Sequence, residues 1–575
     1  MTDKAQPTRL SCGGVRATFA AAVLAAFAVT AAGCAQSPTG TAASKPPTPT
    51  LPASLTGEVS WRTCPNSYWH KNADAAFKRN QADCGAIQVP AVYSGRQGAD
   101  LPAFSIAMMR LRATGKTKRG TLFINPGGPG QSGIDQLQTS NFPAKLRQAY
   151  DIVGFDPRGV ARSQPVSGNP IRCTDELDFA TYWNGEDSPS NQSEADLNKK
   201  LSDDYANDCI ANNPAWWTLG TADVARDLEQ MRTRVAGDAK LNFLGSSYGT
   251  TIASYYLRLF PKTSGHIVLD SVTDNSPDED TSALTRAKSL EAQVLRLVDG
   301  YAKAKGMTRA QVQALLMQVR GWGDDNQLRG FAGLKPFPGS STARLSSEYM
   351  FTHGIHVLTY YDSETALQYF TEGLDAVRKS KWNGLFEYLA LNMDGYDLES
   401  MYKAYQNEAG YNPTGYTRDN SYEIMTMVNG IDRDQRELKT HAEQDAFDVK
   451  YAKAAPFWHK LTTDPSGFKY YDDEPVNMWS WEAFKNDAIP DPPKNAAPRT
   501  NTTGKPVLIV GSLKESVTPY AFAVSTAKQL KSPLITWTGT EHAPLAGFAH
   551  SCLNQVFLDY MLEDSLPSKG KTCSK

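Results

Sequence analysis

A serine flanked by glycines, set between a short apolar run and a helix-like segment, constrains the fold of this chain more than any other feature. Residues 240–244 are typical of a buried strand and residues 250–258 of a helix. Between them lies Gly245-Ser-Ser-Tyr-Gly249. A nucleophile elbow needs this strand, turn and helix, because the turn strains its serine and brings the backbones so close that flanking side chains would collide. The register of the motif favours Ser247 as the nucleophile, and Ser246 is the alternative.

Short apolar runs alternate with helix-like segments from Trp61 to about Asp274. This alternation predicts a mainly parallel sheet covered by helices. The candidate strands in this part of the chain are residues 120–125, 150–155, 240–244 and 266–269.

Long helical periodicities begin after this region, together with many aromatic and Met residues. They cover residues 283–303, 309–320 and 365–380. A Pro-rich stretch then leads to two more candidate strands, at 505–510 and 533–537. We therefore predict an α/β-hydrolase fold, with core parts at 57–274 and 496–575 and a helical lid inserted at 275–495.

Acyl transfer needs hydrogen-bond donors for a developing oxyanion, and a glycine-rich loop occurs where this fold places them. Asn125-Pro-Gly-Gly-Pro-Gly130 directly follows the strand predicted at 120–125. We expect the amides of Gly128 and Tyr248 to be the donors, with Gly127 as the nearest alternative. An isolated Gly/Pro segment of this kind would be an ordinary turn.

A serine hydroxyl becomes a good nucleophile when a histidine accepts its proton, and in this fold the histidine follows a late strand. His542 meets this requirement, because it comes shortly after the strand predicted at 533–537. His550 lies further on, within the predicted final helix beside Cys552, and is the alternative.

A carboxylate must orient this histidine, and it too should follow a strand. Glu515 is the one carboxylate in the loop 511–519 after the strand predicted at 505–510. Asp270, at the end of the strand 266–269, is the alternative. Asp156 and Arg158 precede the serine, so we assign them a structural role.

The N-terminus predicts export. Basic residues precede the apolar run 17–32, as in a signal peptide, and Ala31-Ala-Gly-Cys34 resembles a lipobox in which Cys34 would be lipidated. We expect residues 1–34 to be a signal peptide with a lipobox, and the Pro/Thr/Ser-rich residues 35–56 to be a tether. The protein would then be a lipoprotein of the cell surface, anchored at the membrane, or a secreted protein. An uncleaved helix is the further alternative.

Six cysteines remain after Cys12 and Cys34, an even number that suits an oxidising compartment. Short separations favour the disulfides Cys64–Cys84, Cys173–Cys209 and Cys552–Cys573. The sequence has no CxxC pair, no P-loop and no Gly-x-Gly-x-x-Gly after a strand, so we expect no metal and no cofactor. A balance of 59 basic and 61 acidic residues argues against nucleic acid as a partner.

Several motifs together resemble the secreted tripeptidyl aminopeptidases and proline iminopeptidase-like serine peptidases of actinobacteria, including lipoprotein members with a TAP-like C-terminal region. The resemblance spans roughly 61–275 and 500–573. Its motifs are residues 125–130, Phe155-Asp-Pro-Arg-Gly159, residues 221–228, Gly245-Ser-Ser-Tyr-Gly-Thr250, Val268-Leu-Asp270, Val517-Thr-Pro519 and the ending 566–573.

The family takes its catalytic acid from an Asp-x-x-Thr-Pro segment, and Glu515-Ser-Val-Thr-Pro519 matches it with glutamate. The resemblance thus implies that Ser247, Glu515 and His542 are catalytic and that Thr518 supports the acid. A second departure is Glu541, which stands where the family usually has glycine.

The resemblance implies an aminopeptidase that releases short peptides, of tripeptidyl or prolyl type, from free N-termini through an acyl-enzyme. A carboxylesterase with the same triad is the alternative, because fold does not decide the acyl group. A surface lipoprotein that binds peptides without catalysis is the second alternative. In each case the expected partner is a peptide or another small substrate, and a membrane is involved only through Cys34.

Overall fold

The structure is a computed structural model. All the residues it describes belong to one compact unit, Pro49–Lys575. The described residues are 59–69, 77–93, 101–167, 169–173, 189–324, 347–380, 420–432, 440–463 and 505–575. The predicted signal peptide, lipidation site Cys34 and tether lie outside them, as does much of the predicted lid.

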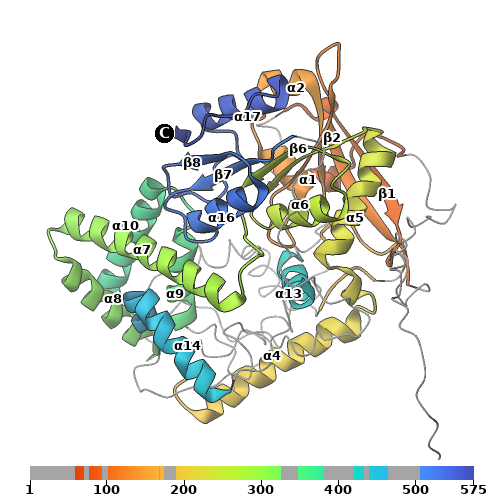
Figure 1. Cartoon of the computed structure of the whole chain (residues 1–575). Coiled ribbons are helices and arrows are strands. Elements are labelled where there is room, and N and C mark those ends of the chain that lie inside the picture. The colour runs from red at the N-terminus through yellow and green to blue at the C-terminus, as the bar shows by residue number, and fades with distance from the viewer. Residues whose placement is uncertain are drawn as a thin grey trace, which may run out of the picture. The chain divides into compact units, whose positions relative to one another are not determined.

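A nine-stranded sheet forms the centre of the described chain, with the strand order β1-β2-β4-β3-β5-β6-β7-β8-β9 (Figure 1). The strands are β1 (Ala82–Val89), β2 (Phe104–Leu111), β3 (Gly120–Asn125), β4 (Tyr150–Phe155), β5 (Leu241–Ser246), β6 (Ser264–Asp270), β7 (Leu508–Ser512), β8 (Leu534–Trp537) and β9 (Thr572–Cys573). β1 pairs with β2, and β2 with β4, in antiparallel fashion, whereas the pairs from β4 to β9 are parallel. The predicted mainly parallel sheet is therefore confirmed.

Helices cover both faces of this sheet, because alternate strand residues point to opposite sides. Phe123 of β3 belongs to one apolar cluster, while its neighbours Leu122 and Ile124 belong to the other. The first face is covered by α4 (Gln192–Asn212), α5 (Thr221–Met231), α6 (Tyr248–Leu259) and α16 (Tyr520–Leu530). The second face is covered by α1 (Gly133–Thr139), α2 (Ala144–Ala149) and α17 (Ser551–Glu563).

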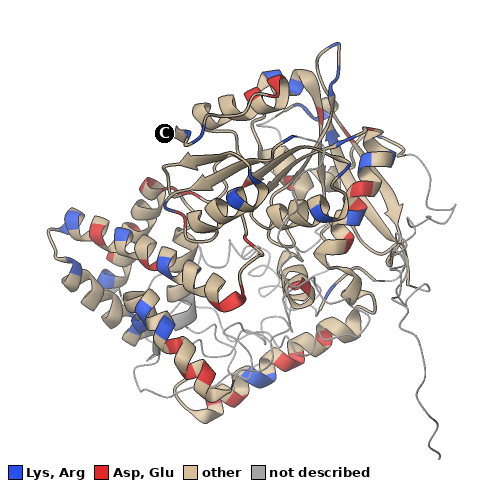
Figure 2. Cartoon of the chain, in the orientation of Figure 1, with Lys and Arg blue, Asp and Glu red and all other residues tan. Residues whose placement is uncertain are grey.

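Most helices between β6 and β7 form a third apolar cluster of their own, and we call these the lid helices. They are α7 (Glu279–Lys305), α8 (Arg309–Asp324), α9 (Ser347–Leu358), α10 (Ser363–Ser380), α14 (His441–Ala454) and α15 (Pro456–Thr462). The longest, α7, begins where Asp278 accepts a hydrogen bond from the amide of Thr281, and it ends at Gly306 in the left-handed region. Charges of both signs are present along α4, α7 and α14 (Figure 2).

One helix of the predicted lid region packs differently. α13 (Ser421–Asp432) places Ile424, Met427 and Ile431 in the apolar cluster of the sheet, together with α5 and α6. These three residues recur at helical spacing, so they form one stripe that faces the core. Part of the segment predicted as lid therefore belongs to the core packing.

Three disulfides join the cysteine pairs that the sequence predicts: Cys64–Cys84, Cys173–Cys209 and Cys552–Cys573. The last pair links α17 to β9 and so closes the C-terminal edge of the sheet. In the described ranges, none of the helices has the length and apolarity that crossing a lipid bilayer requires.

Candidate active site

Ser247 lies in the sharp turn between β5 and α6. Its φ of 53° and ψ of −125° are a strained conformation for a residue with a side chain. A Cβ on Gly245 would collide with the carbonyl oxygen of Gly249, so a glycine is needed where strand and helix approach. The amide of Ser247 donates to the carbonyl oxygen of Asp270 at 2.9 Å, which ties the turn to the end of β6.

Four adjacent parallel strands end at the same edge of the sheet as this turn. β5, β6, β7 and β8 end at Ser246, Asp270, Ser512 and Trp537. The loops after parallel neighbouring strands meet at one edge, so residues far apart in the sequence are brought together there. Glu515 lies in the loop after β7, and His542 lies in the loop after β8.

Glu515 holds His542 through a direct contact between its Oε1 and the ring nitrogen Nδ1. The same oxygen accepts from the hydroxyl of Thr518 at 2.5 Å, and Oε2 accepts from the hydroxyl of Ser271 at 2.8 Å. Only 2% of Glu515 is exposed. Burial lowers the pKa of His542, but the adjacent carboxylate of Glu515 more than offsets it, and the pKa stands above its ordinary value.

Asp270 and Ser271 connect the serine turn to the histidine loop. Asp270 accepts the amide of Ser247 on its main chain and the amide of Leu545 on its side chain, at 3.0 Å. The hydroxyl of Ser271 accepts the amide of Ala543, the residue after His542, at 2.8 Å. Ser247 and His542 are thus fixed against the same pair of residues.

The carboxyl of Asp270 is fully buried at this position. Its Oδ2 also accepts the hydroxyl of Ser246 at 3.4 Å, whereas its Oδ1 has no hydrogen-bond partner in the described part of the chain. Burial, together with the nearby charge of Glu515, raises the pKa of Asp270 to about 7. Glu515, and not Asp270, forms the contact with Nδ1 of His542.

The glycine-rich loop 125–130 lies against the serine turn. A Cβ on Gly127 would be 2.9 Å from both the Cβ of Ser247 and the amide nitrogen of Tyr248. The amide of Gly127 already donates to Oδ1 of Asn125 at 3.0 Å. Gly128 therefore carries the next amide in the loop that could donate to an oxyanion. Tyr248 is the first residue of α6, where an N–H has no acceptor within the helix. Both expected donor segments are therefore adjacent to Ser247.

Comparison with known proteins agrees with this arrangement. Residues 120–329 match the alpha/beta hydrolase fold family, and residues 476–573 match the TAP-like protein family. The chain has the α/β-hydrolase fold, and its C-terminal segment is similar to the TAP-like proteins.

Three relatives align with the hydrolase over most of its length. Serine protease Hip1 of Mycobacterium tuberculosis is 27% identical over 574 residues, which cover 96% of each chain. The tripeptidyl aminopeptidase of Streptomyces coelicolor is 27% identical over 515 residues, covering 85% of this chain and 83% of its own. Carboxylesterase B of M. tuberculosis is 27% identical over 531 residues, covering 90% of each chain. The first two relatives support a serine peptidase.

The lid helices hold the acid and histidine loops of the hydrolase from outside the sheet. The carbonyl oxygen of Tyr360 accepts the amide of His542 at 3.2 Å, and the two rings meet edge to face with centroids 5.4 Å apart. Gln293 and Arg296 of α7 both donate to the carbonyl oxygen of Lys514, the residue before Glu515. A cavity of about 220 Å³ lies between α7, the segment 358–367 and the histidine loop.

Glu541, the residue that departs from the family pattern, has a partner in this structure. Its Oε1 contacts Nε2 of His550 at 3.0 Å, and its Oε2 accepts the amide of Thr540 at 3.0 Å. The ring of His550 stacks on Trp537, with centroids 4.2 Å apart. His550, the alternative base, is thus engaged with Glu541 and lies just before α17 rather than inside it.

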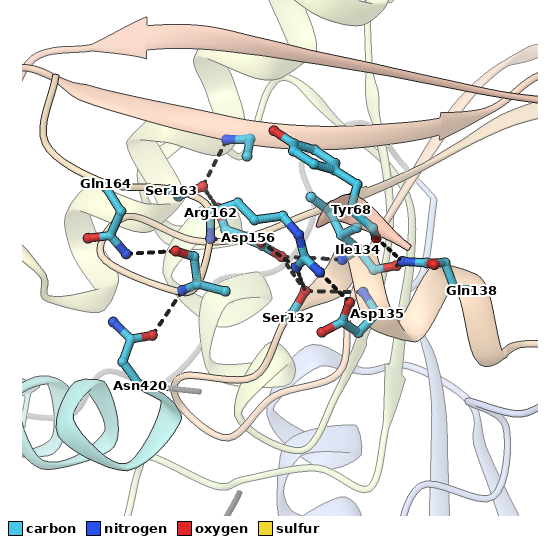
Figure 3. A network of polar contacts seen from close by, with 12 residues as sticks. Tyr68, Ser132, Ile134, Asp135, Gln138, Asp156, Arg162, Ser163, Gln164 and Asn420 are labelled. Carbon is cyan, nitrogen blue, oxygen red and sulfur yellow. Dashed lines mark hydrogen bonds and ion pairs between the residues drawn. The ribbon is translucent and has the colours of Figure 1, made fainter. Parts of the chain in front are cut away.

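Asp156 and Arg158 have structural contacts, in agreement with their expected role. Asp156 is fully buried and contacts Ser132 and Arg162 in the network of Figure 3. Arg158 forms a bidentate pair with Asp227, at 2.7 and 2.6 Å. No group of three His, Cys, Asp or Glu residues in the described ranges is placed to hold a metal ion.

Sequence reasoning missed Ser271 and Tyr360. Ser271 could have been found, because it is a polar residue directly after a predicted strand at the carboxyl edge of the sheet. Tyr360 left no such signal, because it acts through its main-chain oxygen and lies in the turn after a lid helix.

Proposed function

We propose that the hydrolase is an exported serine aminopeptidase that releases short peptides from free N-termini through an acyl-enzyme on Ser247. One observation carries the proposal. The strained serine turn and the loop of His542 are both fastened to Asp270 and Ser271, while Glu515 occupies Nδ1 of the histidine. In the proposed reaction, the other ring nitrogen, Nε2, accepts the proton of Ser247.

The reaction follows from these positions. Oγ of Ser247 attacks the carbonyl carbon of the scissile peptide bond, and Nε2 of His542 takes the hydroxyl proton. The carbonyl oxygen becomes an oxyanion that accepts from the amides of Gly128 and Tyr248. His542 then passes its proton to the leaving amine as the C–N bond breaks. Water, activated by the same histidine, hydrolyses the acyl-enzyme.

Glu515 stabilises the imidazolium that forms in each of these steps. Its carboxylate stands against Nδ1, and Thr518 and Ser271 fix the two carboxylate oxygens. Glutamate is one methylene longer than the family aspartate, and its Oε1 lies in contact with Nδ1 of His542, which supports this role.

The substrate class is supported by the relatives named serine protease and tripeptidyl aminopeptidase. The test is turnover of trialanine para-nitroanilide compared with its N-acetylated form. The expected result is that the free amine is cleaved well and the acetylated form poorly. Equal cleavage of both forms would contradict an aminopeptidase.

A carboxylesterase is the second candidate, supported by the relative named carboxylesterase B. Turnover of para-nitrophenyl butyrate without any turnover of the anilides would favour it. Labelling by a fluorophosphonate, present in the wild type and absent in Ser247→Ala, would exclude a protein that binds peptides without catalysis. Failure of the wild type to label would favour such a binding protein.

Location at the cell surface rests on the sequence, through the predicted signal peptide and Cys34. Metabolic labelling with a fatty-acid probe tests it. Label is expected on the wild type and not on Cys34→Ala, and label on both would contradict lipidation at this cysteine.

A further inference from the structure

Helix α13 touches the glycine-rich loop and is linked to Tyr248 through Thr221. The helix is short and its apolar stripe is fixed in the core cluster of the sheet. A carboxamide and a carboxylate stand at its two ends, because Asn420 precedes its first residue and Asp432 is its last residue. One end binds the turn after β4, and the other binds the start of α5.

At the N-terminal end, Asn420 binds the turn that follows β4. Its Oδ1 accepts the amide of Ala161 at 2.9 Å (Figure 3). Its Nδ2 donates to the carbonyl oxygens of Gly159 and Ile171 at 2.8 and 3.1 Å. Asn420 is 2% exposed, so this set of bonds is shielded from water. The next residue, Ser421, lies so close to Gly130 that a Cβ on that glycine would collide with its carbonyl oxygen.

The turn held by Asn420 is itself joined to the end of the glycine-rich loop. Arg162 binds Asp156 at 3.2 Å, and Asp156 contacts the hydroxyl of Ser132 (Figure 3). Ser132 caps α1 by accepting the amide of Asp135 at 3.1 Å. The loop 125–130 thus packs directly against α13 at Gly130, and Ser132, just beyond the loop, is joined to α13 through this network.

At the C-terminal end, Asp432 binds the start of α5. Its carboxylate accepts the amide of Thr221 at 3.0 and 3.1 Å and also contacts the threonine hydroxyl. The hydroxyl of Thr221 in turn contacts the phenol of Tyr248. Tyr248 follows the nucleophile and carries the second proposed donor on its main chain.

We infer that α13 is a strut of the oxyanion hole, and that Asn420 and Asp432 are positioning residues that set the separation of the Gly128 and Tyr248 amides. This inference rests on the proposed function only in requiring an oxyanion hole at these amides. A rigid helix joins the two donor segments, so a change at either end alters the site that binds the oxyanion and leaves the serine and histidine in place.

Four substitutions separate this role from simple packing. Asp432→Ala removes the link to Thr221, whereas Asp432→Asn keeps an acceptor for the Thr221 amide and adds a donor for its hydroxyl. Asn420→Ala removes the link to the turn. Asn420→Asp has nearly the same shape but cannot donate to the carbonyl oxygens of Gly159 and Ile171. We therefore expect Asp432→Asn to keep activity and Asn420→Asp to lose it.

The expected result for Asp432→Ala, Asn420→Ala and Asn420→Asp is a fall in kcat of about 10- to 100-fold with little change in KM. Asp432→Asn should keep kcat near that of the wild type. Thr426→Val is the control inside α13, because the one partner of its hydroxyl among the described residues is the carbonyl oxygen of Tyr422, within the helix. Its kcat should equal that of the wild type.

The affinities of two inhibitors, an aldehyde and the corresponding alcohol, give a readout that a purely structural role would not change. Ser247 adds to the carbon of trialanine aldehyde, its proton passes to His542, and the aldehyde oxygen becomes the oxyanion. The corresponding alcohol binds without forming an oxyanion. The impaired variants should bind the aldehyde at least about 10-fold more weakly and the alcohol as tightly as the wild type.

Equal weakening of aldehyde and alcohol, or a wild-type kcat in folded Asn420→Asp, would overturn the inference. Thermal melting identifies any variant that does not fold, and if Asp432→Ala fails to fold, the Asn420→Asp and Asp432→Asn pair decides. If the wild type cleaves only para-nitrophenyl butyrate, the assignment as a peptidase is wrong. The same variants then test the role of α13 by their kcat on this ester. A wild type inactive on both substrates would overturn both proposals.

Discussion

Glu515 and His542 are joined through one carboxylate oxygen and Nδ1, and the other oxygen of Glu515 is bound by Ser271. Ser271 also receives the amide of Ala543. Glu515 therefore fixes the histidine loop in two ways. It contacts the imidazole directly, and it binds Ser271, which accepts the main-chain amide next to His542. The charge of Glu515 raises the pKa of His542 in spite of its burial.

Glu515→Gln should lower kcat by on the order of 10³- to 10⁴-fold, because a neutral amide neither stabilises the imidazolium nor fixes its tautomer. The loss of charge also removes the largest effect that opposes burial, so the pKa of His542 falls. The acidic limb of kcat/KM, measured between pH 4 and 9, should then move to lower pH.

Glu515→Asp is the matched control for this substitution. It keeps the charge, so the acidic limb should stay near the wild-type position, while the shorter side chain lowers kcat. An unchanged kcat in Glu515→Gln would show that another carboxylate orients the histidine.

Asp270→Asn distinguishes the alternative acid and tests its buried carboxyl. Because the pKa of Asp270 in the folded protein is about 7, above its ordinary value, the folded state binds the proton more tightly than the unfolded state. The wild type therefore loses stability through this group as the pH rises from about 4 to about 7. The substitution removes that loss.

The measurement is urea unfolding of both proteins at pH 5 and pH 8. The stability of Asp270→Asn relative to the wild type should increase between these two values, and kcat should fall far less than in Glu515→Gln. A loss of kcat as large as that of Glu515→Gln would identify Asp270 as the catalytic acid.

Much of the fold followed from apolar periodicity. The runs at 120–125 and 150–155 coincide with β3 and β4, because both strands are buried on two faces and read as continuous apolar segments. The segment 283–303 lies inside α7, whose ends are set by Asp278 and Gly306. Strand ends were less accurate: the run predicted at 505–510 is β7, Leu508–Ser512.

The sequence could not show which segments of the predicted lid pack against the sheet. α13 has the same amphipathic character as the lid helices, and its place is decided by Asn420 and Asp432 bonding to residues far away in the sequence. The same holds for Glu541. Its departure from the family pattern is visible in the sequence, but its contact with His550 depends on how the loop folds.

Glu541 and His550 should position the histidine loop. His550→Ala removes the contact to Glu541 and the stacking on Trp537, and kcat is expected to fall by up to about 100-fold, since small displacements of a catalytic group are costly. KM should change little. The assay is steady-state turnover of the preferred substrate, with thermal melting to verify folding.

His266 and Asp564 provide the matched control, because they form a contact of the same kind, at 2.7 Å. His266 lies near the start of β6, at the edge of the sheet opposite the active site. Asp564→Asn should leave kcat unchanged. Equal effects of His550→Ala and Asp564→Asn would contradict a positioning role.

Arg158 and Asp227 form a buried ion pair beneath the first face of the sheet, and the hydroxyl of Tyr93 also donates to Asp227 at 2.7 Å. Arg158→Met leaves the carboxylate buried without its cation, and the free energy of unfolding should fall by about 3–5 kcal/mol. Urea unfolding measures this loss.

Lys200→Ala tests an exposed pair by comparison, since Lys200 contacts Asp204 on the surface of α4. It should produce no measurable change in the free energy of unfolding. A similarly small effect of Arg158→Met would show that Asp227 is protonated or that water replaces the guanidinium.

β6 and β7 are neighbours in the sheet although all the lid helices lie between them in the sequence. A nascent chain therefore carries Ser247 on a complete elbow long before the ribosome has made Glu515 or His542. Truncated or partly synthesised chains hold a nucleophile without its base. The proposed acyl-enzyme chemistry therefore cannot begin until the last strands have docked.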